Sequence, residues 1–95
     1  MSDYERNTVL PVSEVLALAD RILPDRAGLQ AGKRTPHEAA FSGAEGQVLL
    51  EMHRHGPFTT VTVRTDGLRT SKVDVVVRYL LNQMPYQASD EPREY

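Results

Sequence analysis

The chain has 95 residues, enough for one domain with a modest core, and it lacks cysteine, which excludes a disulfide framework and a thiolate nucleophile or metal ligand. It has 11 basic and 13 acidic residues, a net charge of −2, and no apolar run that approaches membrane-spanning length. We therefore expect a cytoplasmic protein without a membrane segment.

The N-terminal third of the chain predicts one helix between two irregular segments. Residues 1–9 are polar, and we expect a loose tail before a single α+β domain over residues 10–84. From Pro11 to Leu23, apolar residues recur at helical spacing, and Pro24 is expected to end this helix. Residues 24–36 contain two glycines and two prolines, which predicts a loop.

The central segment, residues 47–65, predicts a β-hairpin that turns at His55-Gly56-Pro57. Alternating apolar residues place one face of each strand toward a core, and the other face is mostly polar. With this turn, the expected cross-strand pairs are Val48 with Val63, Leu50 with Val61, and Met52 with Thr59. Residues 38–42 are expected to be extended as well, before the hairpin.

After the hairpin, Asp66-Gly67 predicts a turn into a short third strand at residues 68–70. Residues 72–84 predict a second helix, capped by Thr70 or Ser71, with Asp74 and Arg78 as an i,i+4 pair. The valines of residues 73–77 also alternate, so a strand is the alternative there. Residues 85–95 are polar, and we expect a disordered acidic tail.

The order of elements predicts an α+β fold: a helix, a two- or three-stranded antiparallel meander and a C-terminal helix, with both helices covering one sheet face. Such a small sheet leaves an open edge and little core. A second copy could pair with the open edge or bury an apolar helix face, so we expect a homodimer.

A basic cluster is the first candidate site. Residues 52–72 contain four cationic side chains against Asp66 alone, and these could contact phosphates: Arg54, Arg64, Arg69 and Lys72. Nucleic-acid binding is therefore an alternative, although the acidic overall charge favours a solvated surface.

Alternating polar residues near the hairpin turn are the second candidate site. Glu51, His53 and His55 share one strand face, and carboxylate and imidazole are ordinary ligands of divalent metals, with His37 as a further candidate. We expect solvated side chains there, with a small-ligand or metal site as the alternative.

Tyr79 and Tyr86, near the end of the second predicted helix, are candidate interface residues, because aromatic side chains are enriched at interfaces. The sequence contains no nucleophile elbow, phosphate-binding glycine loop or HExxH pattern, and no cofactor is expected. The leading hypothesis is therefore a non-enzymatic interaction or regulatory module that acts as a homodimer.

Overall fold

The computed structural model describes residues 2–85, which form one five-stranded antiparallel sheet and two helices. In chain order the elements are β1 (Ser2–Thr8), α1 (Val12–Ala27), β2 (Gln30–Arg34), β3 (Glu38–Gly43), β4 (Gly46–His55), β5 (Phe58–Thr65) and α2 (Lys72–Asn82). The strand order across the sheet is β1-β5-β4-β3-β2. The predicted α+β class is confirmed, but the sheet is larger than the expected two or three strands.

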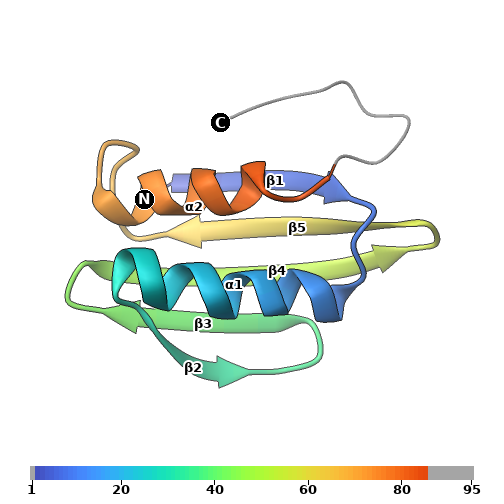
Figure 1. Ribbon diagram of the computed structural model, residues 1–95, viewed down its shortest axis with the longest axis horizontal. Helices are drawn as coiled ribbons and strands as arrows, with labels where there is room; N and C mark the ends of the chain where they lie inside the picture. The colour runs from blue at the N-terminus through green and yellow to red at the C-terminus, as the bar shows by residue number, and fades with distance from the viewer. Residues whose placement is uncertain (1, 86–95) are drawn as a thin grey trace.

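The molecule has two layers, because both helices pack against the same face of the sheet (Figure 1). The helices lie side by side and run in opposite directions. Between the layers lies a core of buried aliphatic and aromatic side chains to which both helices and four of the strands, all except β2, contribute. Neither helix combines the length and the apolar character needed to span a bilayer, within the part of the chain that the structure describes.

The central hairpin forms as predicted, but its register differs from the expected one by two residues. Val48 pairs with Thr65, Leu50 with Val63, and Met52 with Val61. The reason is the position of the two-residue turn: the expected pairs place His55 and Gly56 in the loop, whereas His55 pairs with Phe58 and the loop consists of Gly56 and Pro57. Gly56 has φ 64°, and proline fixes a negative φ, which is the sign pattern of a type II′ hairpin turn. A two-residue shift keeps every side chain on its predicted face.

The N-terminal segment is a strand, where the sequence predicted a loose tail. Strand β1 pairs with β5 along its whole length, from Ser2 opposite Thr65 to Thr8 opposite Thr59. The sequence does not reveal this strand by alternating apolar residues, because its buried positions are Tyr4, Arg6 and Thr8. Residues 86–95, most of the predicted acidic tail, lie outside the described residues.

Helix α1 continues past Pro24, which was predicted to end it. Pro24 lacks the N–H that would bond to the carbonyl of Asp20, and both residues are exposed, so water can solvate that carbonyl. The last helical residue is Ala27, and Gly28 caps the helix in the left-handed conformation, with φ 65°. Its backbone N–H donates to the carbonyls of Leu23 and Pro24.

Strand β2 replaces the loop predicted over residues 24–36. All five of its residues are exposed, and its pairing with β3 is irregular between Ala31 and Arg34, so neither an apolar pattern nor a clean alternation marks it. Arg34 donates to both carboxylate oxygens of Asp20 on α1, at 2.9 and 2.6 Å, which joins this edge strand to the helix layer.

Helix α2 forms where it was predicted, so the alternating valines of residues 73–77 do not form a strand. Ser71 is its N-cap, and the Ser71 Oγ accepts a hydrogen bond from the backbone N–H of Asp74 at 3.1 Å. The third strand predicted at residues 68–70 is wrong. That segment is a turn, in which the N–H of Ser71 donates to the carbonyl of Leu68.

Candidate functional site

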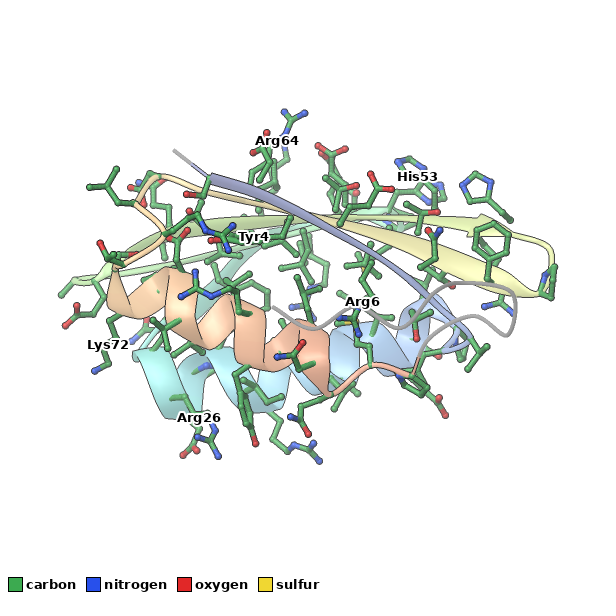
Figure 2. All side chains as sticks on the ribbon, turned by 90° about the horizontal axis from the view of Figure 1, so that it is seen from above. Tyr4, Arg6, Arg26, His53, Arg64 and Lys72 are labelled. Atoms are coloured by element: carbon green, nitrogen blue, oxygen red, sulfur yellow. The ribbon has the colours of Figure 1, made fainter. Side chains whose placement is uncertain are left out.

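The face of the sheet opposite the helices is not covered by any element within residues 2–85. Figure 2 shows Arg64 and His53 pointing away from the helix layer, whereas Tyr4 and Arg6 lie between the layers. Carboxylates, hydroxyls, amides and imidazoles dominate the uncovered face, and Leu49, Ala40 and Phe58 are partly buried apolar residues on it. The predicted contrast between a covered and a wetter face is therefore present, and the wetter face is open to a ligand or partner.

A shallow hollow of about 480 Å³ lies on the uncovered face, across β2 to β5. The side chains of Lys33 and Arg64 line it together with Ala40, Ser42 and Leu49. Arg64 faces the Asp3 carboxylate at 3.9 Å, and both side chains are more than half exposed, so this ion pair contributes little. The hollow has a mixed lining without a concentrated charge.

The predicted basic cluster does not assemble in one place. Arg54 lies five residues along β4 from Leu49, the partner of Arg64, which corresponds to roughly 17 Å along the hairpin. Lys72 lies on the helix side of the molecule, far from Arg64 on the opposite face (Figure 2). The cationic side chains therefore point away from one another.

Two of these arginines instead hold parts of the fold together. Arg54 donates to the carbonyl of Leu10 at 3.2 Å and to the Thr59 hydroxyl at 2.9 Å, which fastens the loop after β1. Arg69 places its guanidinium 5.3 Å from the ring centre of the buried Tyr4. These contacts give both side chains a structural role.

The structure separates the two histidines of the candidate metal site, His53 and His55. The His53 ring stacks on His37, with ring centres 6.1 Å apart and 16° between the ring planes. His55 lies against Phe58, with ring centres 5.4 Å apart. Glu51 shares the uncovered face with His53, but no group of three or more His, Asp or Glu side chains in residues 2–85 is arranged to hold a metal ion.

A buried polar network between the sheet and the helices was missed by the sequence analysis. The Asp74 carboxylate has no exposed surface, and it accepts hydrogen bonds of 2.8 Å from the hydroxyls of Tyr4, Thr65 and Ser71. The predicted Asp74–Arg78 pair is replaced by an indirect link, because Arg78 donates to the Tyr4 hydroxyl at 3.1 Å. The network joins β1, β5 and α2.

Burial raises the pKa of Asp74, but the hydrogen bonds from Thr65, Tyr4, Ser71 and Ser2 outweigh burial and bring the pKa below its ordinary value. The carboxylate therefore stays charged in the folded chain at neutral pH. Hydroxyl donors around a buried carboxylate cannot be recognised from spacing, because Tyr4 and Asp74 are 70 residues apart.

The outer surface of the helix layer carries exposed apolar side chains. Val75 is 50% exposed and Tyr79 is 37% exposed, one helical turn apart on α2. The Arg26 guanidinium lies 4.0 Å from the centre of the Tyr79 ring and donates to its hydroxyl at 3.1 Å. Tyr86, the second predicted interface residue, lies outside the described residues.

Near the start of α1 and the end of α2, the helix layer is hollowed into a groove of about 420 Å³. Its lining is Leu10, Glu14, Ala17, Leu18, Arg21, Gln83 and Pro85. The floor is thus mainly apolar, while Glu14 and Arg21 supply charge at its border. No spacing in the sequence predicts this groove, because residues 10–21 and 83–85 meet only through the packing of α1 on α2.

Comparison with known proteins adds no relationship to these observations, since no family model and no curated protein matches the chain.

Proposed function

We propose that this chain is a small non-enzymatic interaction module that acts as a homodimer, and that two copies pair through the outer surfaces of their helix layers. The observation that supports this proposal is that the outer surface of the helix layer carries both an apolar ridge and a mainly apolar groove. The ridge consists of Val75 and Tyr79, and the groove is the 420 Å³ hollow near Leu10 and Leu18.

The ridge is suited to association because one of its two side chains is held in place before any partner binds. Arg26 stacks on the Tyr79 ring and bonds to its hydroxyl, which restricts the rotation of the ring. Binding an ordered side chain costs less conformational entropy than binding a free one. Tyrosine is also among the residues enriched in interfaces.

The ridge and the groove lie toward opposite ends of α1. Tyr79 contacts Arg26 in the last turn of this helix, whereas the groove includes Glu14 in its first turn. A twofold axis that crosses the helices exchanges these ends, so the ridge of each copy would enter the groove of the other. The same arrangement brings Arg26 of one copy toward Glu14 of the other, which adds charge complementarity.

The dimer is tested by the substitution Val75→Lys, measured by sedimentation equilibrium at micromolar concentration. Lysine favours helix at least as well as valine, so α2 should persist, while a charge that the partner's groove would bury opposes association. We expect the wild type to be dimeric and the variant to be monomeric. Leu68→Lys is the matched control, because Leu68 is 71% exposed but lies in the turn before α2.

A monomeric wild type would refute the homodimer, and dissociation by Leu68→Lys but not by Val75→Lys would refute this seam. The nucleic-acid alternative stays a prediction without a favouring observation, since Arg54, Arg64 and Lys72 point in different directions. The non-enzymatic part of the proposal rests on the lack of a catalytic motif in the sequence.

A further inference from the structure

Two carboxylates face each other on the uncovered side of the sheet. Glu38 of β3 and Glu51 of β4 are direct cross-strand partners. Like charges in such positions destabilise an antiparallel pair. Neither glutamate takes part in an ion pair within residues 2–85, where Arg34 and Arg64 pair with aspartates instead.

The two stacked histidines lie next to this carboxylate pair. His37 directly precedes β3, and His53 follows Glu51 by two residues on the same face of β4. The N–H of Met52 donates to the carbonyl of His37 at 2.8 Å, which fixes the backbone between the two imidazoles. Both histidine side chains are solvent-accessible and can rotate about their side-chain bonds.

We propose that His37 and His53 together bind a divalent transition-metal ion, such as zinc, and that Glu38 and Glu51 favour it by their charge. Imidazole is an ordinary ligand of zinc, nickel and copper. Zinc–nitrogen bonds of about 2.1 Å require the two nitrogens to lie within about 4.2 Å of each other. The ring centres are 6.1 Å apart, so the rings must turn toward each other about their side-chain bonds to bind one ion.

This assignment changes the ligand set that the sequence suggested. Alternation along β4 grouped Glu51 and His53 with His55, but His55 packs against Phe58 beside the hairpin turn. The actual neighbour of His53 is His37, which the pairing of β3 with β4 brings to it. Two imidazoles are the protein ligands, and water completes the coordination. The site lies on the opposite layer from the proposed dimer seam.

Titration with zinc chloride by isothermal calorimetry tests the site, using protein without a histidine tag. We expect one ion per chain, and a loss of affinity of at least about tenfold in His37→Ala and in His53→Ala, since even outer partners of a metal site contribute that much. His55→Ala is the matched control and should bind as the wild type does. Glu51→Gln should weaken binding less than either histidine variant.

Absence of zinc binding by the wild type would overturn the site, and so would wild-type affinity in His53→Ala. Equal losses in His55→Ala and His53→Ala would overturn the assignment of His37 as the partner. Thermal unfolding of each variant without metal checks that the fold is retained, as exposed positions predict. Val75→Lys should bind zinc like the wild type, which separates this test from that of the dimer.

Discussion

At the scale of single residues, Asp74 joins elements from both ends of the chain. Its carboxylate is fully buried, and it receives hydroxyl hydrogen bonds from β1, β5 and the cap of α2. Hydrogen bonds to a charged group are stronger than those between neutral groups. A single side chain therefore holds the N-terminal strand against the C-terminal helix.

Asp74→Asn should destabilise the fold by about 2 kcal/mol, because the amide keeps the shape but loses the charge and one acceptor oxygen. One of the three hydroxyls would then face an N–H donor instead of an acceptor. The free energy of unfolding in urea at neutral pH measures this loss. Asp25→Asn, an exposed change in the last turn of α1, is the control and should alter stability by less than about 0.5 kcal/mol.

The same residue gives a pH dependence with a definite sign. The folded-state pKa of Asp74 lies below its unfolded value of about 3.9. Its contribution to stability is therefore complete at pH values above about 3.9 and is lost as the pH falls through the folded-state pKa. Urea unfolding between neutral pH and about pH 3 should show a smaller acid-induced loss in Asp74→Asn than in the wild type. Equal losses would show that other carboxylates dominate.

The candidate residues differ in how far the sequence could predict them. His53 was found from alternation within one strand, which is a local property. His37, by contrast, reaches it through the pairing of β3 with β4, and the sequence predicted that extended segment without a register. Arg54 and Arg64 are close in sequence, but Arg54 lies next to the turn of the hairpin and Arg64 lies near its open end.

At the scale of elements, the predictions held where apolar side chains repeat and failed where they do not. The faces of β4 and β5 and the position of α2 follow from Leu50, Val61 and the other buried valines and leucines. Strand β2 has no buried residue, and the inward positions of β1 are polar or aromatic. Pairing with a neighbouring strand, rather than local hydrophobicity, determines these two edge strands.

Gly28 determines where α1 ends. Its φ of 65° is left-handed, and a Cβ added there would have no atom within 4 Å, so a substitution meets backbone strain alone. We expect Gly28→Ala to cost about 1 kcal/mol and Gly28→Asn less, because asparagine tolerates this conformation better. Thermal unfolding measures both. Gly32→Ala should be nearly neutral, because φ there is not left-handed and an added Cβ would only make an ordinary contact of 3.6 Å with the carbonyl oxygen of Ala40. A cost equal to that of Gly28→Ala would contradict this explanation.

At the scale of the whole molecule, the N-terminal strand closes the structure. Strand β1 covers the edge of β5, and its inward side chains reach α2 at both ends: Tyr4 bonds to Asp74, and Arg6 donates to the carbonyl of Met84 at 3.1 Å. Arg6 is only 3% exposed, and its charge lies close to the C-terminal end of α2, where a cation is favourable. The sheet and the helix layer are thus linked through residues that the sequence placed in a loose tail.

Residues 1–8 were predicted to be a loose tail, whose removal would leave stability unchanged. Because residues 2–8 form β1, we expect their removal to abolish cooperative unfolding. The deletion exposes the backbone donors and acceptors of β5, and it leaves Asp74 without the Tyr4 hydroxyl in a site that excludes water. Urea denaturation followed by circular dichroism should change from a sigmoidal transition to a gradual one. Asp3→Thr is the matched control, because Asp3 is on the outward side of the same strand and its ion pair with Arg64 is exposed. A deletion variant with wild-type cooperativity would mean that β2 to β5 and the two helices fold without β1.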